Sequence, residues 1–177
     1  DKVDAKQAAA EVFDYCMDRL KGYYQDQGIG ADAVDSVLAG DVRVPSDIHK
    51  RILAVEAFRR LPEAEALTAA NKRIRNILRK SDESISAELD PTSLREEAER
   101  RLAAQVKEAK LSIAPSLETQ DYEGVLKILA GLRNDVDAFF DQVMVMAEEP
   151  EVRRNRLALL SAIEDLFLGV ADISRLQ

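Results

Sequence analysis

The sequence contains very few of the residues from which disulfides and metal sites are built. Its 177 residues include one cysteine, Cys16, and one histidine, His49. A single cysteine excludes a disulfide within the chain and a cysteine-based zinc site, and a lone histidine without clustered ligands argues against any metal site. We therefore predict no metal site and a cytoplasmic location, and we interpret Cys16 as a small core residue on an apolar helix face.

Long apolar runs and known catalytic motifs are also absent. The longest apolar runs, such as LALLSAI at 157–163, are far shorter than the roughly 20 residues that cross a bilayer. No glycine-rich phosphate loop, nucleophile elbow or signal-peptide pattern is present. We expect no membrane partner and no catalytic residue here. Because the chain opens with Asp and is already helical in pattern, we expect a piece of a longer polypeptide.

The composition favours helices, with 46% hydrophobic residues, only 5% aromatic residues and no tryptophan. In the first predicted helix, Val12, Cys16 and Leu20 recur at helical spacing. We predict an all-α bundle of seven to eight helices in a single domain over 1–177. The predicted helices cover 4–27, 31–39, a segment capped by Ser46 or Asp47 and ending near Arg60, 62–80, 90–112, 121–132, 134–147 and 151–170. The stretch 81–91 has no helical periodicity and is predicted to be a flexible loop or boundary.

Charge is unevenly distributed along the chain. The formal net charge is −8, yet residues 71–80 carry five bases and no acid. Residues 81–100 carry seven acids and two bases. Affinity for nucleic acid comes from clustered Lys and Arg, so this distribution is more informative than the net charge.

A helical wheel over 67–80 places the apolar residues on one inward stripe: Leu67, Ala70, Ile74, Ile77 and Leu78. The polar residues are then expected on the wet surface: Asn71, Lys72, Arg73, Arg75, Asn76, Arg79 and Lys80. Such a run can be an ordinary solvated helix face, but solvated faces usually interleave Glu with Lys, and this one has no acid. We predict RNA as the polyanion that offsets the charge, with the cations on phosphates and Asn71 and Asn76 near bases.

Two further stretches each allow two interpretations. Arg153, Arg154 and Arg156 open the last helix and are second-rank candidates for the same RNA, or they pair with Glu148, Glu149, Glu151 or acids of 81–100. The stretch 137–150 is rich in large apolar residues, which we interpret as core, with a stacking platform for unpaired bases as the alternative. These residues are Phe139, Phe140, Val143, Met144 and Met146.

Three stretches together resemble a known family: FDYCMDRLKGYYQDQGIGADAVDSVLA at 13–39, RILAVEAFRRLPEAEALTAANKRIRNILRK at 51–80, and VDAFFDQVMVMAEEPEVRRNRLALLSAIEDLFLGVADISRLQ at 136–177. They are similar to the C-terminal region of bacterial glycyl-tRNA synthetase β subunits, which ends in a helical anticodon-binding domain of the DALR type. The resemblance covers nearly the whole chain, and the loop at 81–91 matches it least.

The resemblance implies recognition of the anticodon arm of glycine tRNA. It also implies that the amino-acid activation chemistry lies on a separate α subunit, so ATP and Mg²⁺ belong to the whole enzyme and no cofactor to this chain. The implied partners are glycine tRNA, the remainder of the β subunit and the α subunit. The alternative function is a helical protein-interaction module that docks an acidic partner through its basic face.

Overall fold

The computed structural model describes residues 5–40, 42–81 and 89–177, and this part of the chain forms eight α-helices and two short 3₁₀ helices without a strand. The elements are α1 (Ala5–Asp26), α2 (Ala31–Leu38), α3 (Pro45–Phe58), α4 (Ala64–Lys80), η1 (Pro91–Ser93), α5 (Glu97–Glu118), α6 (Tyr122–Ala130), α7 (Arg133–Gln142), α8 (Pro150–Leu168) and η2 (Ile173–Arg175). The predicted all-α class and helix number are confirmed. Most of the loop predicted at 81–91 lies outside the described residues.

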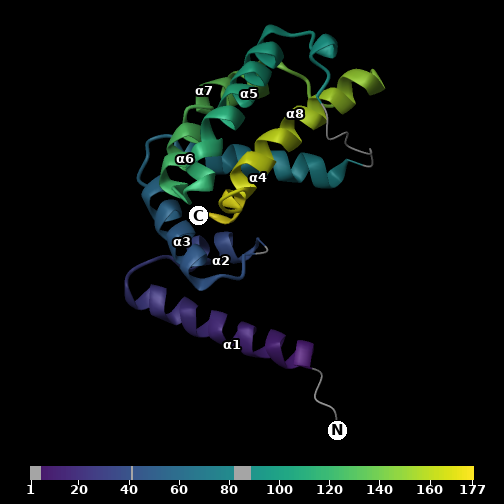
Figure 1. Ribbon diagram of the computed structural model, residues 1–177. Coiled ribbons are helices and arrows are strands. Elements are labelled where there is room, and N and C mark those ends of the chain that lie inside the picture. The colour runs from purple at the N-terminus through teal and green to yellow at the C-terminus, as the bar shows by residue number, and fades with distance from the viewer. Residues whose placement is uncertain (1–4, 41, 82–88) are drawn as a thin grey trace.

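Helix α1 lies at one end of the molecule, where it packs against α2 (Figure 1). Among the side chains of α1 that the structure describes, Met17 and Tyr24 are buried, and the Tyr24 hydroxyl lies 2.7 Å from His49 Nδ1 on α3. Val12 and Cys16 are exposed, so the prediction that Cys16 is a core residue is wrong. The apolar residues of α1 extend around more than one face, and the contact with α2 and α3 selected the face that carries Met17.

The helix starts differ from the prediction by a few residues. Helix α3 begins at Pro45 without a side-chain cap, so the predicted Ser46 or Asp47 cap is wrong. Pro45 needs no cap for its own nitrogen, because proline has no amide hydrogen. Asp47 instead accepts a hydrogen bond from Arg51 Nε at 3.0 Å, within the same helix. Helix α4 begins at Ala64, two residues after the predicted start at Pro62.

The helix predicted from Asp90 to Ser112 is two separate elements. Asp90 caps only the 3₁₀ turn η1, by accepting a hydrogen bond from the Thr92 amide at 2.9 Å. Helix α5 starts afresh at Glu97, where Glu96 and Glu99 form a reciprocal capping box. It continues through Pro115 to Glu118.

Helix α7 ends at Gln142, five residues before the predicted end at Ala147. In the irregular segment that follows, Val143 and Val145 are buried, whereas Met144 and Met146 are 74% and 52% exposed. This alternation has the period of an extended chain. The prediction that both methionines are core residues is therefore wrong, because it assumed helical spacing.

Helices α4 and α8 cross in the centre of the molecule, and the chain after α8 returns to pack η2 against α4 (Figure 1). Phe58 on α3 meets Phe167 on α8 edge to face, with ring centroids 6.4 Å apart. Arg51 donates to the carbonyls of Gly169 and Val170 at 2.8 and 2.9 Å, which satisfies acceptors at the end of α8. These contacts fix α8 and η2 beside the basic helix α4.

Candidate nucleic-acid interface

The inward stripe of α4 is as the sequence predicts. Leu67, Ala70 and Ile74 are buried, and Ile77 and Leu78 are half-buried. The stripe packs against α7, α8 and η2. Because these residues face inward, the cations at the C-terminal end of α4 are left on the outer surface of the helix.

Asn71 is not on that surface. Its side chain is 4% exposed, and its Nδ2 donates a hydrogen bond of 3.0 Å to the Leu67 carbonyl one turn earlier. The expectation that Asn71 faces solvent and reaches a base is therefore wrong. Asn71 lies at the border of the apolar stripe, and its amide can be buried because the helix backbone supplies an acceptor.

Lys72 and Arg75 are held by the C-terminal segment that follows α8. Lys72 Nζ donates to the Leu176 carbonyl at 2.6 Å, and the Arg75 guanidinium forms an ion pair with Asp172. Asp172 is 4% exposed and also accepts a hydrogen bond from Arg175 at 2.9 Å. Arg75 therefore helps to attach η2 to α4, although its side chain remains 44% exposed.

The Asp172 carboxylate is stabilised in its charged form. Burial by itself would raise the pKa of Asp172, but hydrogen bonds from Ser174 and Arg175 and the charge of Arg75 bring the pKa below its ordinary value. The group is therefore ionised at neutral pH. Asp172 therefore pairs with Arg75, one of the five cations of 71–80 that we predicted to contact RNA.

Apart from Lys72, which bonds a backbone carbonyl, three cations of α4 have no carboxylate partner among the described residues: Arg73, Arg79 and Lys80, all of them exposed. Arg79 Nη2 donates a long hydrogen bond of 3.3 Å to Asn76 Oδ1. Arg73 lies over the ring of Phe140 on α7, with its guanidinium carbon 4.1 Å from the ring centroid. The exposed end of α4 is thus positively charged, and Asn76 adds an amide to it.

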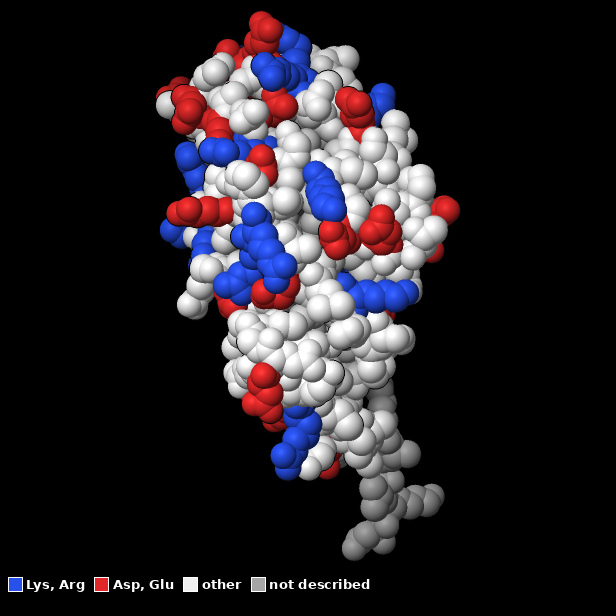
Figure 2. Space-filling view, turned by 90° about the vertical axis from the view of Figure 1, so that its left-hand side faces the viewer, with Lys and Arg blue, Asp and Glu red and all other residues white. Residues whose placement is uncertain are grey.

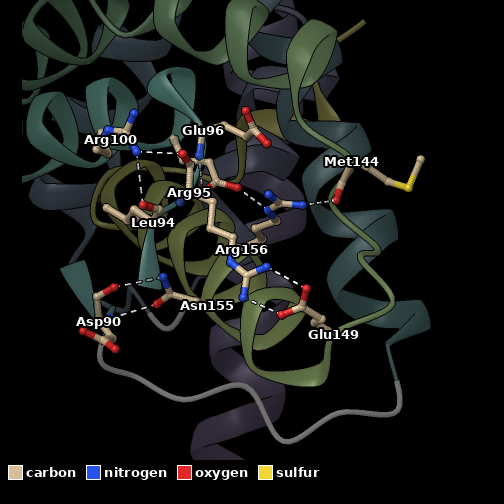
Figure 3. A network of polar contacts seen from close by, with 10 residues as sticks. Asp90, Leu94, Arg95, Glu96, Arg100, Met144, Glu149, Asn155 and Arg156 are labelled. Atoms are coloured by element: carbon tan, nitrogen blue, oxygen red, sulfur yellow. Dashed lines mark hydrogen bonds and ion pairs between the residues drawn. The ribbon is translucent and has the colours of Figure 1, made fainter. Parts of the chain in front are cut away.

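The second basic cluster divides between surface and interior, and Figure 3 shows the polar contacts of Arg156. Arg156 is 7% exposed, forms an ion pair with the buried Glu99 of α5, and donates from Nη1 to the Met144 carbonyl at 2.7 Å. The prediction that Arg156 faces RNA is therefore wrong, and its pairing with an acid of 81–100 is confirmed. The helix turns Arg156 inward, and Glu99 neutralises it there.

The two neighbours of Arg156 lie nearer to solvent. Arg153 donates to the carbonyls of Ala147 and Glu148, at 2.6 and 3.2 Å, and is half-buried. Arg154 is exposed. Of this cluster, Arg154 is the side chain most available to a ligand.

Further polar contacts lie near Arg156. Asn155 exchanges two hydrogen bonds with the Asp90 backbone, at 2.8 and 2.9 Å, and Arg95 pairs with Glu149 (Figure 3). The start of α8 is therefore tied to η1 and to the residues before α5. Sequence reasoning missed these pairs, although the excess of acids in 81–100 indicated where partners for 153–156 are found.

Acidic and basic side chains are interspersed on the face of the molecule shown in Figure 2. In the described part of the chain, no group of three or more His, Cys, Asp or Glu residues is arranged to hold a metal ion. None of the described helices is long and apolar enough to span a membrane. The features that stand out for ligand binding are therefore the free cations of α4 and the Arg73–Phe140 stack.

Comparison with known proteins identifies a family. A family model described as "DALR anticodon binding domain" matches residues 67–171, from α4 to just past the end of α8. Glycine–tRNA ligase beta subunits are similar over the chain: that of Pseudoalteromonas translucida is 46% identical over all 177 residues, and that of Glaesserella parasuis is 47% identical over the same length. That of Marinobacter nauticus is 49% identical over 95% of the chain.

The chain spans about a quarter of the length of these relatives, 26% of the first two and 24% of the third. The resemblance inferred from the quoted stretches is confirmed. The matched residues include the exposed end of α4, the Arg73–Phe140 stack and the whole of α8. The chain belongs to the DALR anticodon binding domain family.

Proposed function

We propose that this chain binds the anticodon arm of glycine tRNA, as the tRNA-recognition part of a glycine–tRNA ligase. The observation that carries the proposal is that a domain of the anticodon-binding family contains, within residues 67–171, a helix end whose exposed cations lack carboxylate partners among the described residues. The names of the relatives supply the amino acid. Binding of the arm would supply the negative charge that residues 71–80 lack.

Within this function, Arg79 and Lys80 are the main phosphate contacts, because they are exposed at the end of α4. They also lie in the last turn, where the partial negative charge of the helix dipole favours cations in the free protein. Lys72 and Arg154 extend the same role to neighbouring surface. Arg75 can contribute only with the part of its guanidinium that Asp172 leaves free.

Recognition of an anticodon requires more than positive charge. Glycine anticodons carry cytosine at their second and third positions, and the pairing edge of cytosine has an amine donor beside two acceptors. Arg73 provides donors at the surface of α4, and Asn76 provides both a donor and an acceptor. These two side chains are the proposed base contacts, in place of the buried Asn71.

In the whole enzyme, we place the activation of glycine, with its ATP and Mg²⁺, on a separate α subunit. The remainder of the β subunit and the α subunit are then the protein partners, and the enzyme works in the cytoplasm. The names of the relatives, of which this chain spans about a quarter, give a glycine–tRNA ligase with a beta subunit. The other assignments follow from the family resemblance and are part of the proposal.

The test compares glycine tRNA with a version in which the two anticodon cytosines are replaced. Binding to the full-length polypeptide that contains this chain, assembled with its partner subunit, is measured by titration, and the KM for tRNA is measured in aminoacylation. Weaker binding and a higher KM for the altered tRNA are expected. Equal binding of both RNAs would contradict the proposal and would favour a general adapter or an acidic protein partner.

A further inference from the structure

The Arg73–Phe140 pair lies at the surface where α4 meets α7. Phe140 is half-buried, and its ring meets the fully buried Phe139 ring at 5.7 Å and 71°. Arg73 lies on Phe140 with its guanidinium carbon 4.1 Å from the ring centroid. The order of contacts is therefore core, aromatic ring, guanidinium and solvent, from the inside outward.

A second Arg–aromatic pair, Arg51 and Tyr122, differs from Arg73 and Phe140 in how its guanidinium donors are used. Arg51 lies over the ring of Tyr122 at 4.3 Å, but its nitrogens also bond Asp47, two backbone carbonyls and the Tyr122 hydroxyl. Its donors are used within the fold. The guanidinium of Arg73 has no hydrogen bond or ion pair with any residue that the structure describes, and the side chain is exposed.

A guanidinium that lies over a ring in this way can still make two kinds of contact with a ligand. Its outer face is flat and can stack on a nucleobase, and its five N–H donors lie in the plane at the edge of that face. The Phe140 ring restricts the orientation of the guanidinium, so part of the entropy of ordering a long side chain is lost before a ligand arrives. The pair is preorganised for a flat ligand that stacks on the outer face of the guanidinium and for acceptor atoms that lie beside it, in the guanidinium plane.

The surroundings of the pair favour RNA over an acidic protein. Asn76 and Lys80 follow Arg73 on α4 at helical spacing, so an amide and a second free cation lie along the same edge. After Phe140, the chain exposes Met144 and Met146, apolar and polarisable side chains that contact aromatic rings favourably. A carboxylate would need the in-plane donors but would have no use for the flat face.

We propose that Arg73, backed by Phe140, stacks on an unpaired base of the bound RNA loop and that its in-plane N–H groups donate hydrogen bonds to acceptor atoms of an adjoining nucleotide. The inference rests on the proposed tRNA function and adds the position of a base-reading site between α4 and α7. The ring of an unpaired pyrimidine, such as cytosine, fits the flat outer face of the guanidinium. Met144 and Met146 then provide apolar surface for the neighbouring nucleotide.

The experiment uses an anticodon stem-loop RNA of glycine tRNA in which each loop nucleotide is replaced in turn by an abasic one. Binding is measured with the full-length polypeptide, in wild type and in the variants R73A, R73K and F140L. Loss of one stacked base is expected to weaken wild-type binding about tenfold, because a base–side chain stack contributes on the order of one such factor. R73A and F140L should bind the intact RNA about tenfold more weakly, and the same abasic position should then cost nothing further.

The variant R73K and a control distinguish stacking from charge. R73K retains the charge but not the plane, so it should behave as R73A does. The control K80A removes a free cation of α4 that lies over no ring, and it should weaken binding of intact and abasic RNA by the same factor.

Each other outcome rejects the proposal in an identifiable way. Abasic penalties that are identical in wild type and R73A at every loop position would reject stacking and leave the tRNA function standing. Equal binding of glycine tRNA and the anticodon-altered tRNA would reject the function itself. Unchanged RNA binding by R73A, together with weaker binding to polyglutamate, would assign the pair to an acidic protein.

Discussion

The two basic clusters of this chain, at 71–80 on α4 and at 153–156 on α8, have similar chemistry in the sequence but different surroundings in the fold. Four cations of the first, Lys72 among them, are exposed without a carboxylate partner among the described residues. In the second, Arg156 is buried against Glu99, and Arg153 bonds backbone carbonyls. The position of each cation on its helix relative to the packed face accounts for the difference.

This comparison shows that a count of bases does not describe a binding surface. A buried Arg–Glu pair adds no field at the surface, whereas a cation at an open helix end does. Arg75 lies between the two cases, since Asp172 holds it while 44% of its side chain stays exposed. The following variants test whether each cation is buried and paired or exposed and free, from the largest expected effect to the smallest.

The largest effect is expected for R156M. The substitution leaves the Glu99 carboxylate, which is 1% exposed, without its guanidinium partner, and breaking such a buried pair costs about 3–5 kcal/mol. Urea unfolding should show the loss. The double variant R156M/E99Q should recover part of it, because glutamine has no charge and can still accept from the Glu96 amide. A loss below about 1 kcal/mol for R156M would place Arg156 with the surface cations.

A smaller effect is expected for D172N. The carboxylate accepts from Arg75, Arg175 and Ser174, and losing charge-assisted bonds of this kind costs about 1–3 kcal/mol. The comparison is made by thermal unfolding of wild type and D172N at neutral pH. Equal stability would show that Arg75 is free for a ligand.

The pH dependence of the same variant gives a second check. Because the folded pKa of Asp172 lies below its ordinary 3.8, its contribution is present above about pH 4 and is lost as the pH falls through the folded pKa. The stability difference between wild type and D172N should therefore shrink on acidification. A difference that stays constant down to about pH 3 would contradict the assignment.

Reversal of the free cations, R79E/K80E, should act on binding rather than on stability. Affinity for glycine tRNA should fall about tenfold, and the slope of log K against log salt should become shallower by roughly 0.7–0.9 for each phosphate that the variant no longer neutralises. The control K107E/K110E reverses two exposed lysines on α5. It should change neither the affinity for glycine tRNA nor the salt slope to this extent. An unchanged salt slope in R79E/K80E would remove α4 from the interface.

The smallest effect is expected for R154A. Arg154 is exposed, and such surface substitutions usually change the free energy of unfolding by less than about 0.5 kcal/mol. Comparison of R154A with R156M, two residues further along the same helix, shows how sharply side-chain burial changes within one helical turn. A stability loss comparable to that of R156M would contradict the division of this cluster.

Most of the fold was predictable because the helical periodicity is strong in long segments. Leu67, Ala70 and Ile74 fall on one stripe that no other secondary structure would bring together, and the structure buries all three. The start of α5 was not predictable in the same way. Asp90 is a preferred cap residue, but its backbone is bonded by Asn155 on α8, and it caps a separate 3₁₀ turn instead of α5.

The candidate site was predictable in its location but not in its membership. The absence of acids from 71–80 identified α4 as the cationic helix, and Arg79 and Lys80 are exposed there. Asn71 failed as a surface residue because a residue at the border of an apolar stripe turns inward when its amide finds a backbone acceptor. The Arg73–Phe140 stack joins residues 67 positions apart, and no local pattern indicates such a contact.

The sequence by itself determined the all-α class, the approximate helices, the cationic character of α4 and the family, since periodicity, propensity and motif are local properties of the chain. The tertiary structure decided which cations remain free, because that depends on the acids that distant segments bring to them. Glu99 reaches Arg156 from 57 positions away, and Asp172 reaches Arg75 from 97. Electrostatic pairing acts across space, so the surface charge of this protein is a property of its fold.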